Sequence, residues 1–232
     1  MHEFAESLLP FERDFFLWLN DAHTSYWDIF MWIYSGKLIW VPLVIVCFGI
    51  FVYKVKWQEA ILLVLGAVLV GVLCDQISAS VIKPLFERMR PSHHPDFRDY
   101  VEIVNDYRGG RLGFISSHAA NGFGIVAFSS LLFRYRYYTI TITAWALITC
   151  YSRIYLGVHF VTDIIGGILL GLMMGVLSYY IYINLRHYVL KIPRDEIKKP
   201  VLSKTRAQIL MATIGVLVVS IAIYSAIFNN PQ

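Results

Sequence analysis

Three short clusters of basic, hydroxyl and imidazole side chains interrupt an otherwise apolar sequence. In chain order they contain Lys83 and Arg90; Ser116, Ser117 and His118; and Arg153, His159 and Asp163. Lysine, arginine and helix N-termini all attract anions, and an arginine can contact a phosphate through two N–H groups at once. These residue types are the ones needed to bind a phosphate group and to transfer it.

The spacing of His159 and Asp163 is that of a nucleophile and the residue that orients it. Residues four apart lie on one face of a helix, so the carboxylate could accept a hydrogen bond from one ring nitrogen. The other nitrogen would stay unprotonated and could attack phosphorus. His118, on another segment, could act as an acid. The three cations of the clusters would stabilise the phosphoryl oxygens, so this interpretation requires no metal and no other cofactor.

Each cluster also has a structural explanation when it is taken alone. Lys and Arg at the end of a membrane helix often extend to the lipid headgroups, and a serine often caps a helix N-terminus. A single histidine near a membrane surface can be purely structural. What favours a catalytic site is that all three clusters fall at segment ends expected on one side of a membrane.

The composition is that of a membrane protein. Of the 232 residues, 57% are apolar and only 16% are charged, and the mean hydropathy is +0.58. Soluble domains usually contain about a quarter charged residues and under half apolar ones. The ranges 38–53, 164–185 and 207–228 contain no Asp, Glu, Lys or Arg. Two of them reach the roughly 20 residues that cross the hydrocarbon of a bilayer.

Charge and cysteine usage exclude some other classes. The net charge of +4 is small and scattered, so nucleic acid is not an expected partner. Cys47, Cys74 and Cys150 all lie in apolar runs, and an odd number of buried cysteines argues against a disulfide framework. The N-terminus shows no cleavable signal peptide, so the first membrane helix is expected to direct insertion.

The predicted fold is an all-α integral membrane bundle of six transmembrane helices with an interfacial N-terminal helix. The predicted spans are 37–54, 58–82, 115–133, 138–154, 159–184 and 207–228. Residues 37–185 form the expected helical core, which includes an external loop at 84–114. A basic linker at 186–206 leads to an extra C-terminal transmembrane segment at 207–232.

Residues 1–36 are predicted to form an interfacial amphipathic segment. Leu8, Phe11, Phe15 and Trp18 recur at helical spacing, and charged residues occupy the opposite side. The apolar stretch at 27–34 is too short to span a bilayer, and Ser-Gly interrupts it at 35–36.

The distribution of basic residues predicts the orientation. Lys54, Lys56, Arg134, Arg136 and seven residues of the 186–206 linker place eleven Lys and Arg on one side. The other side has nine, of which three are assigned to phosphate binding. Because cytoplasmic loops are enriched in Lys and Arg, the linker should be cytoplasmic and the 84–114 loop external.

The spacing of the clusters resembles the type 2 phosphatidic acid phosphatase (PAP2) superfamily. The matching patterns are Lys-x6-Arg-Pro from Lys83, Ser-x-His ending at His118, and Ser-Arg-x5-His-x3-Asp from Ser152, within about residues 60–185. The resemblance implies a lipid phosphatase of the bacterial branch of the family. It implies that His159 forms a phosphohistidine, that Asp163 orients it, and that His118 protonates the leaving oxygen and then activates water. The residues implied to bind phosphate are Lys83, Arg90, Ser116, Ser117 and Arg153.

The second pattern departs from the family, which usually has Pro-Ser-Gly-His. Here Ile115 replaces the proline and Ser117 replaces the glycine. A side chain at 117 lies where backbone N–H groups approach the phosphate. Because serine is small and can donate a hydrogen bond, we expect function to survive.

Other interpretations remain open at this point. The same patterns also resemble those of the vanadium haloperoxidases, but those enzymes are soluble, and the six apolar spans argue against a soluble protein. A membrane transporter or scaffold would need neither His118 nor the pair formed by His159 and Asp163. His93, His94 and Asp96 could alternatively bind a metal ion. Asp75, which lies within a predicted span, is either functional or a hydrogen-bonded interior residue.

The expected substrate is a phosphorylated membrane lipid, and the expected location is the bacterial cytoplasmic (inner) membrane with the site facing the periplasm. The loop carries Arg98, Arg108 and Arg111 beyond the cluster cations, which favours a lipid A phosphate or undecaprenyl diphosphate. Gly109 and Gly110 would leave room for a sugar. Phosphatidylglycerol phosphate and phosphatidic acid are the alternatives. The alternative for these three arginines is that they pair with the acidic residues of the same loop and bind no ligand. The sequence does not indicate an oligomeric state.

Overall fold

The structure is a computed structural model that describes residues 1–197 and 199–229. In this part of the chain all regular secondary structure is helical, with an isolated β-bridge between Met89 and Leu112. Position 198 of the predicted linker and positions 230–232 of the predicted C-terminal segment lie outside the described residues.

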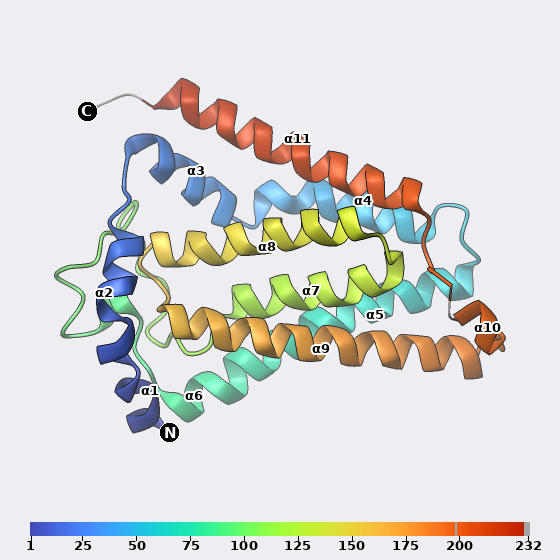
Figure 1. Cartoon of the computed structure of the whole chain (residues 1–232), viewed down its shortest axis with the longest axis horizontal. Coiled ribbons are helices and arrows are strands. Elements are labelled where there is room, and N and C mark those ends of the chain that lie inside the picture. The colour runs from blue at the N-terminus through green and yellow to red at the C-terminus, as the bar shows by residue number, and fades with distance from the viewer. Residues whose placement is uncertain (198, 230–232) are drawn as a thin grey trace.

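Most helices of the bundle run along its long axis (Figure 1). They are α4 (Val41–Val52), α5 (Trp57–Gln76), α7 (Ser117–Phe133), α8 (Arg136–Tyr155), α9 (Val161–Tyr188) and α11 (Lys204–Phe228), whereas α3 (Ser25–Ser35) is inclined to α4 and η1 (Leu38–Trp40) lies between them. The π-helical turn η2 (Ile77–Ile82) and α6 (Lys83–Phe86) extend α5. The short helices at the two ends are α1 (His2–Ser7), α2 (Leu9–Asn20), η3 (Pro91–His93) and α10 (Arg194–Ile197).

Three helical segments are long and apolar enough to cross a membrane, by length and composition. They are Trp57–Phe86, Val161–Tyr188 and Lys204–Phe228. A fourth exists if the bent pair Ser25–Ser35 and Leu38–Val52, with 65° between its two parts, counts as one span. Helix α7 has 17 residues, at the lower limit of the length needed. The chain is thus an all-helical membrane protein with three to four candidate spans.

Close packing of α7 on α9 fixes the two segments that carry the histidines of the site. A Cβ atom at Gly167 would lie 2.5 Å from the carbonyl oxygen of Ser116, and one at Gly171 would lie 2.3 Å from that of Ala120. Gly175 repeats the pattern one turn further along α9. Small residues spaced by four allow two helix backbones to approach closely in a membrane. The start of α9 therefore lies beside the start of α7.

Helix α2 lies across one end of the bundle, against α8 and α9 (Figure 1). It buries Leu9 and Phe16 against the bundle, whereas Phe11, Phe15 and Trp18 are exposed. Helix α3, which belongs to the predicted N-terminal segment 1–36, packs instead on α8 and α11 within the bundle. The exposed aromatic side chains of α2 are those predicted to face the membrane interface.

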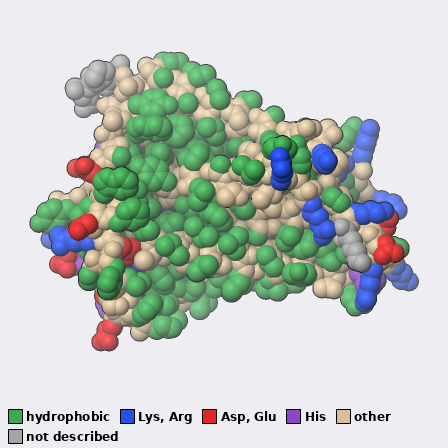
Figure 2. Space-filling view, in the orientation of Figure 1, with side chains coloured by type: hydrophobic (Ala, Val, Ile, Leu, Met, Phe, Trp, Pro, Cys, Tyr) green, Lys and Arg blue, Asp and Glu red, His purple; other side chains and the backbone are tan. Residues whose placement is uncertain are grey.

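The surface is apolar along the middle of the bundle and charged at its ends. Figure 2 shows hydrophobic side chains over most of the face, with Lys and Arg gathered at the end that carries α10. Charged side chains of both signs occur at the opposite end, near α2. A band of this kind is expected when lipid surrounds the middle of a protein and water surrounds its two ends.

Candidate active site

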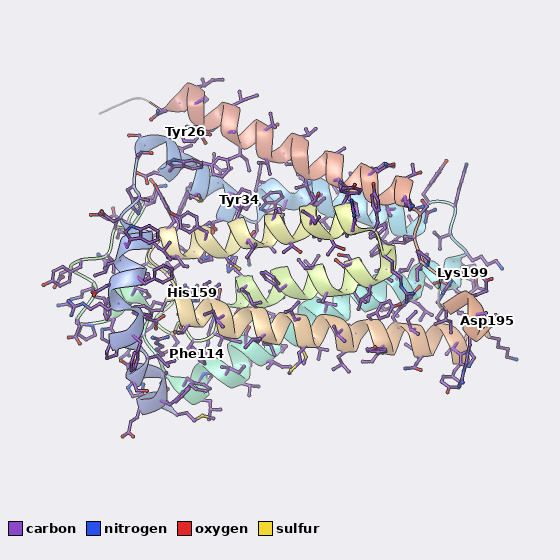
Figure 3. All side chains as sticks on the ribbon, in the orientation of Figure 1. Tyr26, Tyr34, Phe114, His159, Asp195 and Lys199 are labelled. Atoms are coloured by element: carbon purple, nitrogen blue, oxygen red, sulfur yellow. The ribbon has the colours of Figure 1, made fainter. Side chains whose placement is uncertain are left out.

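The three predicted clusters come together at the end of the bundle that α2 covers. His159 lies in the loop just before α9, and Figure 3 places it at the start of that helix. Ser117 and His118 open α7. Arg153 lies in the last turn of α8, and Lys83 begins α6. Four helix ends therefore position one site.

The predicted pair of His159 and Asp163 is present, with a corrected local geometry. Nδ1 of His159 lies 3.3 Å from Oδ2 of Asp163. The same oxygen accepts a hydrogen bond from the backbone N–H of Phe160 at 3.0 Å. The two residues do not share a helix face, because α9 begins at Val161 and leaves His159 outside it. Asp163 therefore caps the start of α9 while it contacts the ring.

Both members of this pair are buried. His159 is 1% exposed and Asp163 is 0% exposed. Burial, together with the charges of Arg90, Arg153 and Lys83, lowers the pKa of His159 well below its ordinary value. The ring is therefore neutral near pH 7, which is the form that can attack an electrophile.

The second carboxylate oxygen of Asp163, Oδ1, contacts Arg88, which was not among the residues predicted for the site. Nη1 of Arg88 donates to Oδ1 of Asp163 at 2.9 Å and to the hydroxyl of Thr162 at 2.7 Å. Nη2 of Arg88 donates to Oε1 of Glu12, which comes from α2. Arg88 lies within the first cluster, two residues before Arg90, so the sequence does indicate that it lies near the site. No comparable sequence signal marks Glu12.

Arg90 is held at the site by backbone oxygens. Its Nε donates to the carbonyl of Leu112 at 3.1 Å, and its Nη1 lies 3.4 Å from that of Val158. Gly109 has φ +65°, and a Cβ atom there would lie 2.7 Å from Nη1 of Arg90. Gly109 thus allows the loop to pack directly on the guanidinium and leaves no room for a sugar there, whereas a Cβ atom at Gly110 would meet nothing within 4 Å.

Arg153 is oriented by side chains from two other segments. Its Nη1 donates to the hydroxyl of Ser35, and its Nη2 lies 3.5 Å from the hydroxyl of Tyr107. The guanidinium also lies 5.8 Å from the centre of the Tyr107 ring. Ser35 is at the break between α3 and η1, so this bend supports a predicted phosphate ligand.

The two serines of the second cluster have different surroundings. Oγ of Ser116 accepts a hydrogen bond from the N–H of Ala119 at 3.4 Å and so caps α7. Oγ of Ser117 lies 3.2 Å from Nζ of Lys83 and accepts from the hydroxyl of Ser78 at 2.8 Å. The residue that replaces the usual glycine therefore links α7 to the first cluster.

Two cavities meet at His118. One, of about 590 Å³, is lined mainly by apolar residues of α4, α5, α7 and α8, and it also reaches Asp75 and Ser117. The other, of about 740 Å³, is lined by Tyr107, Arg153 and residues at the break between α3 and η1. His118 and Lys37 line both. An apolar space and a cation-lined space thus adjoin at the predicted acid.

The histidines of the 84–114 loop do not converge on a common point. A ring nitrogen of His93 lies 3.3 Å from the carbonyl of Gly109. Those of His94 face the carboxylate of Glu6 at 3.0 Å and the N–H of Asp96 at 3.2 Å. In residues 1–197 and 199–229 no three His, Cys, Asp or Glu side chains are grouped as metal ligands.

The additional arginines of the loop have mixed surroundings. Arg108 donates to the carbonyl of Ser92 at 2.8 Å, so it stabilises the loop. Arg98 forms an exposed pair with Asp99 at 3.6 Å. Arg111 is exposed. These contacts favour a structural role for Arg108 and leave Arg111 accessible from solution.

Comparison with known proteins identifies a family and several relatives. Residues 60–187 match the PAP2 superfamily. A lipid A 4'-phosphatase of Porphyromonas gingivalis is 47% identical over 182 residues, which cover 78% of this chain and 77% of that protein. A lipid A 4'-phosphatase of Bacteroides thetaiotaomicron is 38% identical and covers 76% of this chain and 79% of its own. A Bacillus subtilis phosphatidylglycerophosphatase B is 28% identical over 68% of this chain and 72% of its own.

Two solved structures share the fold. The crystal structure of Aquifex aeolicus LpxE superposes with a TM-score of 0.53 at 22% identity, over 73% of this chain and 95% of that one. A PAP2-type phosphatidylglycerolphosphate phosphatase from Bacillus subtilis superposes with a TM-score of 0.55 at 21% identity, over 81% of this chain and 89% of that one. At these identities the likeness concerns the arrangement of helices.

Proposed function

The chain belongs to the PAP2 superfamily and is a membrane lipid phosphatase, and we propose that it hydrolyses a phosphate monoester of lipid A through a phosphohistidine at His159. The observation that carries this proposal is the meeting of the two cavities at His118. A phosphorylated lipid needs cations around the phosphate and an apolar space for its acyl chains. This site offers both within reach of one acid.

The proposed reaction has two steps. The unprotonated nitrogen of His159 attacks phosphorus in line with the lipid oxygen, and the bond between phosphorus and that oxygen breaks. His118 gives its proton to the departing oxygen. It then removes a proton from water, which attacks the phosphohistidine and releases inorganic phosphate. Lys83, Arg90 and Arg153 stabilise the charge on the phosphoryl oxygens in both steps.

Lipid A is the proposed substrate because the two most similar relatives named above are lipid A 4'-phosphatases. Both sequences align over more than three quarters of this chain. The exposed Arg111 is available to a headgroup larger than glycerol. Undecaprenyl diphosphate, phosphatidylglycerol phosphate and phosphatidic acid are the competing substrates.

We also propose six membrane crossings, in which α7 and α8 join the three candidate spans and the bent pair Ser25–Ser35 and Leu38–Val52, counted as one span. Helix α8 has 20 residues and packs beside α7, and its Thr149, Ser152 and Arg153 are buried within the bundle. The exposed Phe11, Phe15 and Trp18 of α2 then rest in the interface of the outer leaflet. The site faces the periplasm across the bacterial inner membrane, and the basic 186–206 linker is cytoplasmic.

A phosphate-release panel tests the proposed function. Purified protein in detergent is given lipid A, undecaprenyl diphosphate, phosphatidylglycerol phosphate and phosphatidic acid, with His159→Ala as the inactive control and excess EDTA in a parallel series. We expect lipid A to have the highest kcat/KM, with activity unchanged by EDTA, and mass spectrometry of the product identifies which phosphate is lost. A higher kcat/KM for another lipid would reassign the substrate, and hydrolysis by His159→Ala would exclude the mechanism.

A further inference from the structure

Arg88 is a fully buried cation that does not lie among the phosphate ligands. Its side chain is 0% exposed, and its guanidinium carbon lies 4.5 Å from the centre of the Phe160 ring. A buried charge is costly unless charged or polar groups surround it. Arg88 meets that requirement with two carboxylates, those of Glu12 and Asp163. It is therefore the link between α2 and the nucleophile's partner.

Glu12 adds a second connection to the same place. Its Oε2 accepts a hydrogen bond from the backbone N–H of Thr162 at 2.8 Å, and its Oε1 accepts from the Thr162 hydroxyl at 2.7 Å. These donors are in the first turn of α9, where N–H groups have no partner within the helix. A carboxylate from 150 residues earlier in the chain thus holds the turn that carries Asp163.

The network contains one positive and two negative side chains, so the loss of any one of them changes the charge that the other two experience. Arg88 lies between two carboxylates, so its single positive charge opposes their mutual repulsion. Without Arg88, Glu12 and Asp163 would be two buried carboxylates with no cation between them. Without the charge of Glu12, Arg88 would act on Asp163 alone and would weaken it as an acceptor for the ring of His159.

We propose that Arg88 and Glu12 are positioning residues, which hold Asp163, and through it His159, in the orientation needed to attack phosphorus. The inference rests on the proposed function, because it concerns the same nucleophile. The charged groups of both residues are engaged by each other, by Asp163 and by Thr162. They act through Asp163, so α2 contributes Glu12 to the support of the site although it lies more than 100 residues before the histidine in the chain.

The proposal predicts a specific pattern of kinetic losses. Removing the hydrogen-bond partner of a metal ligand typically costs about 10- to 100-fold in activity, and we expect a similar range for the partner of a nucleophile's carboxylate. We expect Arg88→Gln to lower kcat about 100-fold and Glu12→Gln about 10-fold, with KM within about threefold of wild type. Asp14→Asn and Arg13→Gln are matched controls, because they change exposed charges on the same helix and should leave kcat unchanged.

A double-mutant cycle separates positioning from loss of structure. In the Arg88→Gln background Glu12 is a buried carboxylate facing Asp163, so adding Glu12→Gln should raise kcat above that of Arg88→Gln alone. Multiplicative losses in the double variant, or an effect on KM only, would overturn the proposal. If Arg88→Gln does not purify as a folded protein, Glu12→Gln and Arg88→Lys decide it. A kcat within twofold of wild type for both would contradict the positioning role.

A second measurement needs no lipid substrate. Diethyl pyrocarbonate modifies neutral imidazoles, and peptide mass spectrometry reports the rate at His159 separately from the other histidines. We expect slower modification in Arg88→Gln and Glu12→Gln than in wild type and the two controls. Wild-type protein that is inactive on every lipid would exclude the proposed function, whereas unchanged reactivity of His159 in these variants would exclude the positioning role.

Discussion

The Nδ1 atom of His159 lies 3.3 Å from Oδ2 of Asp163, and the backbone N–H of Phe160 contacts the same oxygen. The carboxylate therefore contacts the ring and is itself fixed by the start of α9. In the proposed mechanism the other ring nitrogen attacks phosphorus. Because Oδ1 is bound by Arg88, the two oxygens of Asp163 have separate tasks.

Asp163→Asn should lower kcat by about 10³-fold or more. The amide can present an N–H to the ring in place of an acceptor, which favours the wrong tautomer of His159. Its neutral side chain also leaves Arg88 with one fewer carboxylate. Phosphate release by the purified variant measures the loss. Retention of more than about a tenth of wild-type kcat would show that Asp163 does not orient the nucleophile.

His118→Ala should slow both steps and cause phosphoenzyme to accumulate. His118 has the two cavities on either side of it, where it can reach the leaving oxygen and then water. General acid–base groups typically contribute about 10²- to 10⁴-fold. In the test, the variant reacts with lipid that carries a radiolabelled phosphate, the labelled protein is trapped without acid, and the labelled residue is found by peptide mapping. Label on a residue other than His159, or a kcat close to wild type, would contradict this assignment.

Ser117 offers a prediction about the position that departs from the family. Its hydroxyl connects Nζ of Lys83 with the hydroxyl of Ser78. Ser117→Ala removes both contacts and keeps the Cβ atom, so we expect KM to rise about 5- to 20-fold, in line with loss of a hydrogen bond to a charged group. Ser117→Gly also lacks the hydroxyl, but it restores the usual family residue and frees the approach to the backbone N–H groups, so its KM should change by less than about threefold. A KM of Ser117→Ala within about twofold of wild type would show that the hydroxyl has no role in substrate binding.

The sequence predicts the parts of this site that depend on residues close together in the chain. The three clusters were predicted from spacing within a few residues, and the predicted membership of the PAP2 superfamily is confirmed. The predicted contact between Asp163 and His159 is present, but the predicted shared helix face is not. Helix α9, which packs closely on α7, begins only at Val161 and leaves His159 outside it. The roles of the site residues stay predictions.

The residues missed by the sequence interpretation are those whose contacts are distant in the chain. Glu12 meets Thr162 across 150 positions, and nothing local to α2 indicates that one of its charges is buried. Ser35 contacts Arg153 only because the chain bends between α3 and η1. Arg88 could be seen in the first cluster, but its partners could not. Such contacts follow from tertiary packing, which periodicity in one segment does not determine.

The pH dependence follows from the lowered pKa of His159. Burial and nearby cations disfavour the protonated ring, and only the neutral ring can attack. Activity should therefore persist as the pH falls through the ordinary histidine pKa of about 6.5, and it should be lost only at lower pH. The measurement is kcat/KM from about pH 4.5 to about 8, which reports the free enzyme. A loss of activity toward low pH that has its midpoint at or above about 6.5 and does not move with the pKa of the substrate phosphate would contradict this prediction.

The orientation of the chain in the membrane is tested by labelling single cysteines. Arg98 in the 84–114 loop and Arg194 at the start of α10 are both exposed, so a cysteine at either position can react wherever the reagent has access. The native Cys47, Cys74 and Cys150 are first replaced by alanine. Because the site is proposed to face the periplasm, a membrane-impermeant maleimide should label position 98 in intact cells.

Position 194 should react only after the inner membrane is permeabilised, since the basic linker is proposed to be cytoplasmic. Total labelling in detergent is the control that both cysteines are reactive, and phosphate release by each variant confirms that it is folded. Labelling of 194 but not 98 in intact cells would invert the orientation and would place the phosphatase site in the cytoplasm. Equal labelling of both would mean that the two ends of the bundle do not lie on opposite sides of the membrane, which would contradict the proposed crossings.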